Sequence, residues 1–373
     1  MVVAEKELGR RLQLVQGVHW LYGAQGDPYA ALLRGYHGPD PRGAYARSRE
    51  AGPLWRSRLG TWVTARYATA AELLARPVAD GGRPLAAVPQ PQVAVAWERG
   101  LPAPEPWGLP GADRVRALAG RACERLLAGL RGKVDLVAAV CARVPVEVLA
   151  DLHDVAGADR ERLAAACAAA GPALDAALAP PSYEDAAGLP DAVAALGGLL
   201  GEAAVLRAVV EVRAAQELAA GALAALVASP ERWALLAGRG REGAAAVVAE
   251  TLRHDPPVKV HVFTAAADTE AAGQPIAAGE QVAVLIGAAN RDPEVFDRPD
   301  VFDPDRAGTA GAGPRPLVPA PYGVSLEPFA GVVAETVVAA LAAARPGMRA
   351  AGPAVRRPRT PVTGGLLKVP VLL

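Results

Sequence analysis

The side chains that could bind a metal ion or exchange protons are scattered along this chain. The tightest group is the run DLHDV, in which Asp151, His153 and Asp154 are close in sequence but lack the spacing of ligands on one helix face. A solvated turn is the better interpretation of this run. The five histidines do not cluster either: they are His19, His37, His153, His254 and His261. We predict no metal site and no cluster of catalytic residues.

The three cysteines and the first residues indicate where the protein resides. Cys123, Cys141 and Cys167 are odd in number and far apart, which is typical of reduced thiols rather than of a disulfide framework. The N-terminal run MVVAEKELGRRLQLVQG lacks the apolar core of a secretory signal. We also find no stretch that is long and apolar enough to span a bilayer. We therefore expect a cytoplasmic protein that does not bind a membrane.

The charge balance excludes one class of partner. The chain has 39 basic and 39 acidic residues, a formal net charge of zero, and no long basic run. The nearest approach to a basic patch is the cluster of Arg356, Arg357 and Arg359. A solvated turn among prolines is the better interpretation of so short a cluster. Nucleic acid is not expected as a partner, because its recognition needs clustered positive charge.

The elements that would position a site are predicted to be mainly helical, with small sheets. Of the 373 residues 52% are hydrophobic, enough for a large core. Leu8, Leu12 and Val15 are spaced by four and three, which predicts one apolar stripe on a short helix over residues 5–20. The other predicted elements are a linker over 37–43, a helix, a hairpin around Gly60 and a second helix over 45–77, an irregular segment over 79–113, helices over 114–255 with breaks near Gly171–Pro172 and Pro180–Pro181, strands at 258–263 and 281–286, a loop over 307–323, a helix at 331–344 and a last hairpin near TGGLLKVPVLL.

Two motifs in the C-terminal half carry the strongest signal. In AETLRHDPP, Glu250 and Arg253 lie three apart on one helix face, which by itself indicates no more than an ion pair of about 0.2–0.5 kcal/mol. The run AAGEQVAVLIGAANRDPEVFDRPDVFDPDR follows, and PYGVSLEPFAG comes after it at residues 321–331. Together with the segments 45–77 and 134–152, these runs make the chain resemble bacterial cytochromes P-450 over most of residues 43–373.

That resemblance implies a fold and a domain organisation. The fold is expected to be mainly α with small β-sheets, with residues 1–42 as an N-terminal extension and 43–373 as a cytochrome P-450-like domain. Glu250 and Arg253 are expected to be a structural pair. The third arginine that usually joins them falls at Val301, so we expect the pair to be partnered differently here.

The positions that bind and activate haem in that family carry other residues in this chain. When Tyr322-Gly323 is aligned with the family's Phe-Gly, Phe329 falls near the position of the cysteine ligand. All three cysteines precede Glu250, so no shift of the alignment supplies that ligand. The resemblance therefore implies a cytochrome P-450-like fold that lacks the cysteine haem ligand and carries no cofactor.

Proton relay and haem-propionate contacts are replaced as well. The acid–alcohol pair of the long central helix falls at Arg213 and Ala214, which cannot relay protons as a carboxylic acid and a threonine would. The positions of two propionate contacts carry Phe263 and Ala112, although Arg116 is retained. We therefore expect that this chain is not an enzyme.

A narrower resemblance points to the function. Haem-less members of the superfamily are auxiliary proteins of glycosyltransferases in macrolide and anthracycline pathways, and the opening LGRRLQLVQGVHWLYGAQGDPYAALL is similar to theirs. It implies that this chain binds and activates or stabilises a glycosyltransferase that moves a deoxysugar to a polyketide-type aglycone, in a two-to-two assembly. Residues outside the cytochrome body are the candidate docking surface: Leu8, Leu12, Val15 and Trp20.

Two other functions remain open from the sequence. The chain could be a haem-free binding protein that holds a hydrophobic small molecule in the old substrate cavity, or a catalyst of a haem-independent reaction, for which we find no clustered residues. Copurification of one partner protein would favour the helper, and a bound apolar ligand would favour the binding protein.

Overall fold

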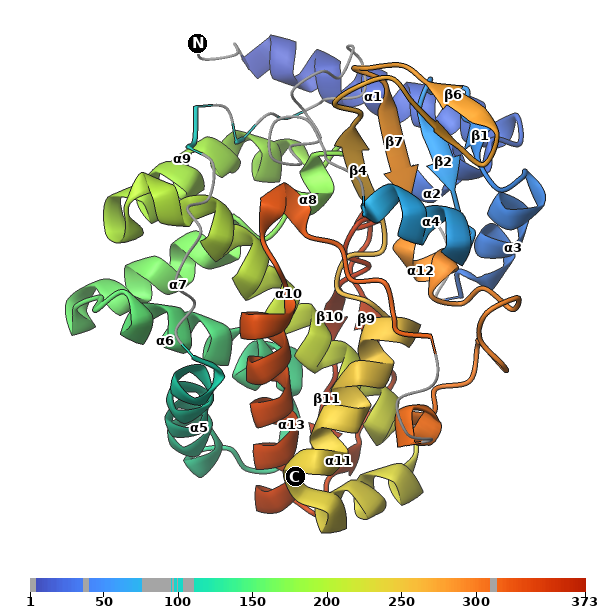
Figure 1. Ribbon diagram of the computed structural model, residues 1–373. Coiled ribbons are helices and arrows are strands. Elements are labelled where there is room, and N and C mark those ends of the chain that lie inside the picture. The colour runs from blue at the N-terminus through green and yellow to red at the C-terminus, as the bar shows by residue number, and fades with distance from the viewer. Residues whose placement is uncertain are drawn as a thin grey trace.

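Helices dominate this computed structural model, which describes residues 5–35, 40–75, 95, 97–98, 100–102, 111–308 and 314–373. The helices are α1 (Glu5–Ala24), α2 (Pro28–Leu33), α3 (Arg42–Glu50), α4 (Tyr67–Leu74), α5 (Ala112–Ala128), α6 (Arg143–Leu152), α7 (Arg160–Ala169), α8 (Ala173–Ala176), α9 (Tyr183–Leu200), α10 (Glu202–Val227), α11 (Pro230–His254), α12 (Ile286–Ala289) and α13 (Val332–Ala344). Figure 1 shows α5, α6, α7 and α9 on one side, α8, α10, α11 and α13 in the middle, and a smaller part with the main sheet on the other side.

The long helix α10 is the centre of the molecule. It is buried along nearly its whole length, since it packs against α9, α11, α13 and α6. Other elements therefore cover α10 on every side, and the charged side chains on it, such as Arg213 and Glu217, are buried as well. Its start is set by Gly201, whose φ of 85° breaks the chain sharply between α9 and α10.

The strands form small sheets at the edge of this helical body. Four of them make one sheet in the order β1 (Trp55–Arg56), β2 (Trp62–Thr64), β7 (Gln281–Val284) and β4 (His261–Thr264). In it β2 runs parallel to β7, so segments more than 200 residues apart are joined edge to edge. The remaining strands are β3 (Lys133–Asp135), β5 (Thr269–Ala271), β6 (Gln274–Ile276), β8 (Arg349–Ala350), β9 (Val355–Arg356), β10 (Leu366–Lys368) and β11 (Pro370–Leu372).

Most of the predicted elements are confirmed. The helix over 5–20 is α1, the helix–hairpin–helix over 45–77 is α3, β1, β2 and α4, and the helix at 331–344 is α13. The chain breaks near Gly171–Pro172 and Pro180–Pro181 flank the short helix α8, as expected. Residues 37–39 of the predicted linker over 37–43, and most of residues 79–110 of the predicted irregular segment, lie outside the described residues.

The last hairpin lies where it was predicted, but the run TGGLLKVPVLL supplies only its second strand, β10. β10 pairs with β9, whereas β11 pairs with β3 and β8. Only Val369 separates β10 from β11, and one residue cannot reverse the chain as a two-residue turn does. These two strands therefore do not pair with each other. A further hairpin, β5–β6, was not predicted from the sequence. Its two turn residues, Ala272 and Gly273, both have positive φ.

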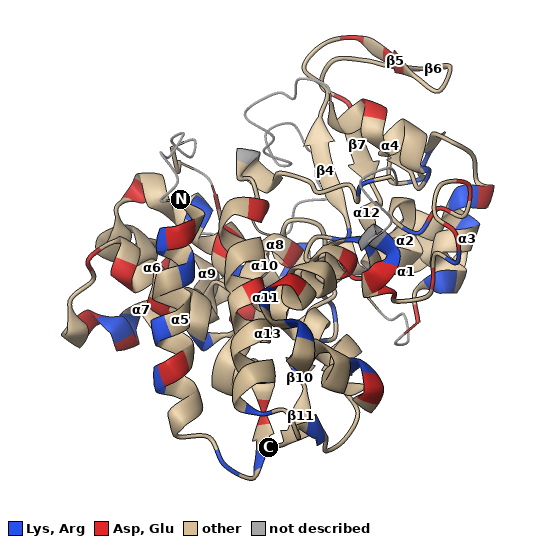
Figure 2. Cartoon of the chain, turned by 60° about the horizontal axis from the view of Figure 1, so that its bottom comes forward, with Lys and Arg blue, Asp and Glu red and all other residues tan. Residues whose placement is uncertain are grey.

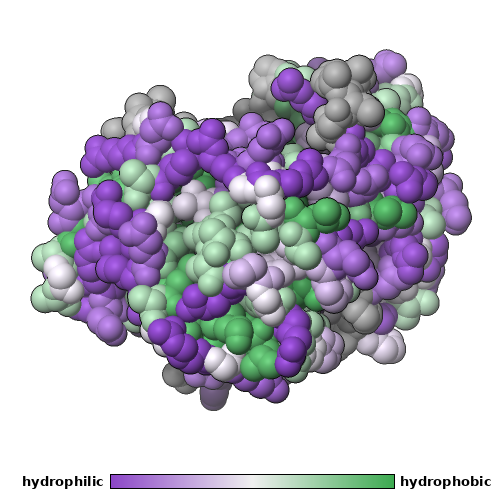
Figure 3. Space-filling view, turned by 90° about the horizontal axis from the view of Figure 1, so that it is seen from below, coloured by the Kyte–Doolittle hydropathy of each residue, from purple (hydrophilic) through white to green (hydrophobic). Residues whose placement is uncertain are grey.

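One expectation about membranes also needs correction. The stretch Glu327–Ala344 is long and apolar enough to cross a bilayer by length and composition. More than half of it is buried, because α13 packs between α5 and α11 as a core helix. On the face of the molecule that is seen from below in Figure 3, hydrophobic residues gather near the middle and hydrophilic residues surround them.

Candidate functional site: the centre of the fold

A buried ion pair lies in the middle of α10. Arg213 and Glu217 are four residues apart on the same helix face, with an Nη2–Oε1 distance of 3.1 Å and side chains only 7% and 4% exposed. Glu217 Oε2 also accepts a hydrogen bond of 2.8 Å from the backbone N–H of Leu366. Gly365 lies against the pair so closely that a Cβ there would be 2.6 Å from Arg213 Nη2.

A second carboxylate holds the same C-terminal turn from the opposite side. Asp175 of α8 is buried and accepts hydrogen bonds from the backbone N–H groups of Val362 and Thr363 at 2.9 and 3.0 Å. The Thr363 hydroxyl donates to its other oxygen at 2.7 Å. The turn at 362–366 is thus fixed to α8 by Asp175 and to α10 by Glu217.

Lysine and arginine side chains complete this cluster. The Lys259 ammonium donates to the carbonyl of Thr363 at 2.9 Å and lies 2.9 Å from the carboxylate of Asp255. Arg356 pairs with the other oxygen of Asp255 at 2.8 Å. Charges from four parts of the chain therefore meet around one turn, and each has a partner of opposite sign or hydrogen bonds to the turn.

The electrostatics of this cluster are those of a buried structural network. Burial raises the pKa of both the Asp175 and the Glu217 carboxyl, and the charge of Arg213 opposes that rise in each case. The pKa of Lys259 is lowered by burial, which Asp255 opposes. Because the oxygens of these carboxylates accept backbone and side-chain hydrogen bonds, the cluster is arranged to hold the turn rather than to exchange protons with a substrate.

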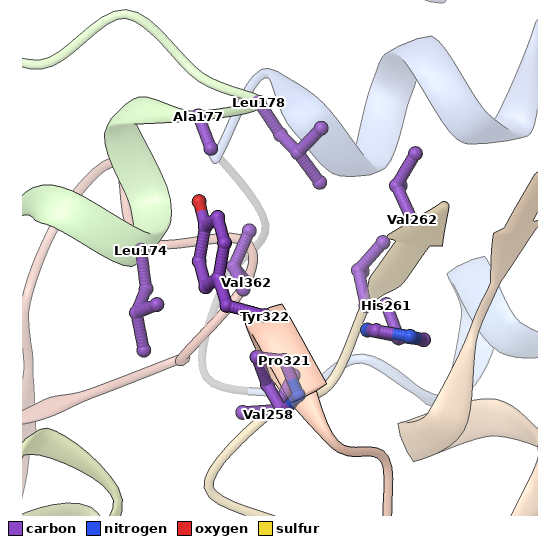
Figure 4. A pocket seen from close by; sticks show the side chains of 10 residues that line it. Leu174, Ala177, Leu178, Val258, His261, Val262, Pro321, Tyr322 and Val362 are labelled. Atoms are coloured by element: carbon purple, nitrogen blue, oxygen red, sulfur yellow. The ribbon is translucent and has the colours of Figure 1, made fainter. Parts of the chain in front are cut away.

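The loop that contains PYGVSLEPFAG closes the centre of the fold. Tyr322 has a positive φ of 53° and is buried, with its ring edge-on to Trp97 at 5.5 Å between centroids. Figure 4 shows Tyr322 standing between Leu174 and Val362. Phe329 is 2% exposed, in the π-helical turn Glu327–Gly331 that leads into α13.

The cavity beside Tyr322 is very small. Its volume is about 30 Å³, and its wall includes His261, Leu174 and Val362. Sites for organic ligands typically measure about 300–1,000 Å³, whereas one water needs only about 10–15 Å³. This cavity, as the described residues line it, therefore accommodates water rather than a ligand.

Glu250 and Arg253 of α11 form a two-pronged pair. Arg253 Nη2 and Nε lie 2.7 and 2.9 Å from the two carboxylate oxygens, and the side chains are 2% and 4% exposed. Arg253 also donates to the carbonyl oxygens of Asn290, Pro299 and Val301. It thus ties α11 to the segment 290–301, and the pair interacts with Val301 through its backbone.

The other positions predicted from the resemblance are dispersed. Phe263 is buried in β4, beside the ring of His261. Ala214 is fully buried on α10, whereas Ala112 is exposed at the first residue of α5. Arg116 pairs with Asp113 on the surface of α5. The structure does not bring these residues together around one site.

The predicted docking stripe faces inward. Leu12 and Val15 are 7% and 2% exposed and belong to the main hydrophobic core, with Leu8 packed against it. The candidate Trp20 is 58% exposed. Two leucines that the sequence analysis passed over, Leu14 and Leu21, are 57% and 51% exposed on the outer side of α1.

Several of the groups first considered for chemistry are paired or buried, whereas Asp154 is exposed and His37 lies outside the described residues. Asp151 pairs with Arg160. Burial lowers the pKa of His19 and of His261 to about 4, so both rings are neutral at pH 7. The thiols of Cys123 and Cys167 have a pKa raised by burial to about 12. Within the described residues, no group of three or more His, Cys, Asp or Glu side chains is placed to hold a metal ion.

The sequence analysis missed Asp175 and Glu217, which fix the central turn. Glu217 carried a signal, because an Arg and a Glu four apart inside an apolar helix are stable only as a buried pair. Asp175 carried none, since its partners are about 187 residues further along the chain.

Comparison with known proteins gives a consistent assignment. The family model for cytochrome P450 matches residues 244–308. The chain is 37% identical to Protein AknT of Streptomyces galilaeus, over 98% of this chain and 96% of that protein. It is 36% identical to Cytochrome P450 family protein EryCII of Saccharopolyspora erythraea, over 98% of both. The crystal structure of Mycobacterium smegmatis CYP164A2 with econazole bound has a TM-score of 0.71 and 25% identity, covering 93% of this chain and 99% of that one.

Proposed function

Because this chain belongs to the cytochrome P450-like family of AknT and EryCII, we propose that it is a non-catalytic auxiliary protein that binds and activates a glycosyltransferase. Members at this level of similarity are P450-like auxiliary proteins of glycosyltransferases in antibiotic biosynthesis. The similarity extends over nearly the full length of the chain, so it includes the surfaces as well as the core. The transferase moves a deoxysugar from its nucleotide carrier to a polyketide-type aglycone, and the complex forms in the cytoplasm.

The centre of the fold carries this proposal. Arg213 and Glu217 fill the part of α10 where oxygen activation would require an acid and an alcohol, and they hold a turn instead. A scaffold whose interior is filled with paired charges can still offer its surface. This supports a function in protein–protein interaction.

Haem, the group that this fold family binds, does not fit the residues present. The three cysteines lie on α5, at the end of the π-helical turn Val137–Cys141 and on α7. The expected ligand position carries the buried ring of Phe329, which has no donor atom. The cavity of about 30 Å³ beside Tyr322 is too small for a macrocycle. We derive no step through haem.

The filled centre also disfavours the alternative of a hydrophobic-ligand carrier. The two small cavities at the centre that described residues line, beside Tyr322 and beside His19, measure about 30 and 10 Å³. A carrier would need about 300 Å³ or more.

The physical route of activation is linkage. A helper that binds only the folded, competent transferase stabilises it by RT ln(1 + [helper]/Kd), about 2.7 kcal/mol at a hundredfold excess over Kd. A dimeric transferase presents two equivalent sites, so the expected assembly has two copies of each chain.

Coexpression tests the proposal. The transferase alone is expected to be weakly active or insoluble, and coexpression with this chain restores soluble protein and sugar transfer. This chain alone transfers no sugar from any nucleotide carrier. A transferase that is fully soluble and runs at full rate without this chain would overturn the proposal.

A further inference from the structure

An open polar cleft lies between α5 and the junction of α6 and α7. Its volume is about 490 Å³, far larger than the cavities at the centre of the fold. Figure 2 shows charged residues of both signs on the three helices around it. One wall is the face of α5 that carries Arg114 and Arg121, and we call this feature the α5 cleft.

The α5 wall presents two unpaired arginines. Arg114 and Arg121 are seven residues apart, about two turns or roughly 10 Å along the helix axis, with Ala117 and Leu118 between them. Both are exposed, and neither side chain forms an ion pair or hydrogen bond within the described part of the chain. Such pairing is available on this helix, because Arg125 pairs with Glu147 at 3.0 Å.

The opposite wall is already largely neutralised. Arg160 of α7 pairs with Asp151 and, at 3.0 Å, with Glu147. Of the charges that line the cleft, three arginines face the two aspartates Asp151 and Asp154, which leaves a formal charge of +1. The uncompensated positive charge lies on α5.

The shape and polarity of the cleft favour a protein segment as its occupant. Small-molecule sites are usually enclosed and mostly apolar, and this cleft is neither. A partner helix with two carboxylates seven residues apart would match the spacing of Arg114 and Arg121. The small or apolar residues between its carboxylates would then lie over Ala117 and Leu118. Arginine is also the cation that binds carboxylates with two parallel hydrogen bonds.

We propose that the α5 cleft docks an acidic helix of the partner glycosyltransferase, with Arg114 and Arg121 as its two anchors. This inference rests on the proposed function and adds the chemistry of the contact to it. Because both anchors are exposed, they act mainly on the association rate and on its salt dependence.

The test is charge reversal at both anchors, Arg114→Glu with Arg121→Glu, measured against immobilised transferase. Since both side chains are exposed and unpaired, the variant is expected to melt like the wild type. Its Kd for the transferase rises by about tenfold or more at low salt, with a smaller difference at high salt. Reversing the charge of the facing carboxylates on the transferase restores binding.

A matched control is Arg241→Glu with Arg349→Glu, two exposed arginines outside the cleft that have no ion pair among the described residues. This control is expected to bind like the wild type. If wild type and both variants bind equally, the cleft is not the docking site, although the proposed function stands. If the wild type itself does not bind the transferase, both inferences fail.

Titration with inorganic phosphate distinguishes a small anion as the occupant. Calorimetry on the wild type is expected to show no saturable phosphate binding. Saturable binding that the Arg114/Arg121 variant loses, together with unchanged transferase binding, would reassign the cleft to a small anion and overturn the proposal.

Discussion

Arg213 and Glu217 form a buried ion pair, 3.1 Å apart, in the middle of α10, and Arg213 is where the sequence resemblance predicts the acid of a proton relay. The two side chains lie against Gly365, where a Cβ would be 2.6 Å from Arg213 Nη2 and 2.7 Å from Glu217 Oε1, so a larger residue would require the ion pair to shift. An ion pair without access to water is costly to form and costlier to break, because removal of one partner leaves an unpaired buried charge. The pair therefore serves the fold, and its loss should be visible in stability.

Removing one member of this pair should destabilise the protein strongly. We expect Arg213→Ala to lower the free energy of unfolding by about 3–5 kcal/mol, measured by urea denaturation. The combined change Arg213→Met and Glu217→Leu should cost much less, because no charge is left unpaired. As a control, Arg298→Ala removes the pairs of an exposed arginine with Asp297 and Asp303 and should change stability by less than about 1 kcal/mol. Equal effects of Arg213→Ala and Arg298→Ala would refute the structural role.

Glu250→Ala or Arg253→Ala should have a comparable effect. Arg253 is 2% exposed and holds three backbone carbonyls in addition to Glu250, so its loss leaves several buried acceptors unsatisfied. We expect a loss of about 3–5 kcal/mol and a reduced yield of soluble protein. A wild-type melting temperature in either variant would show that the pair is dispensable.

The buried histidines should make the protein less stable in mild acid. Burial lowers the pKa of His261 in the folded state to about 4, against about 6.5 in the unfolded chain, so between these values only the unfolded chain binds the proton. The neutral, buried histidine therefore makes its full contribution to the free energy of unfolding above pH 6.5. This contribution is lost as the pH falls from 6.5 towards 4, by up to about 1.4 kcal/mol per pH unit for each such histidine.

His261→Phe tests this dependence. The variant should gain stability relative to the wild type as the pH is lowered from 7 to 4.5, measured by urea unfolding at each pH. The neighbouring Phe263→Leu, which does not titrate, should differ from the wild type by a constant amount. A constant difference for His261→Phe as well would mean that His261 titrates normally.

The purified protein should be colourless. With Phe329 buried at the expected ligand position and a central cavity of about 30 Å³, we expect no Soret band even after expression with excess haem precursor. Absorption spectroscopy and a pyridine haemochrome assay check this. Stoichiometric haem with a thiolate-type carbon monoxide spectrum would contradict it.

The outer side of α1 can be tested separately from its core side. If Trp20 contributes to docking together with its exposed neighbours, Leu14→Ala with Leu21→Ala should weaken transferase binding and leave the melting temperature unchanged. Leu12→Ala is the matched contrast, because this residue is buried and its truncation should cost about 2–5 kcal/mol. Unchanged binding by the Leu14/Leu21 variant would discard α1 as a docking surface. Simple removal of residues 1–30 is not a clean test, since Leu12 and Val15 belong to the main core.

Much of the fold could be predicted from the sequence because the signals are local or carried by long motifs. The apolar spacing of Leu8, Leu12 and Val15 predicted α1, and Glu250 with Arg253 marked α11. The direction in which a stripe faces was not predictable in the same way. Helix α1 has apolar residues on two sides, and packing against α2 and α9 decided that Leu12 and Val15 point inward while Leu14 and Leu21 face the solvent.

The sequence by itself determined the family, the helical architecture and the absence of cysteine after Glu250, since each depends only on which residues follow one another. Only the tertiary structure decided what occupies the centre. In the C-terminal turn, Thr363 contacts Asp175, which lies 188 residues earlier, and Leu366 contacts Glu217, which lies 149 residues earlier. No periodic pattern in the sequence encodes contacts between residues so far apart. The tertiary structure likewise left the side chains of Arg114 and Arg121 without partners among the residues it describes, because an ion pair depends on which charges the packing of helices brings within about 4 Å of each other.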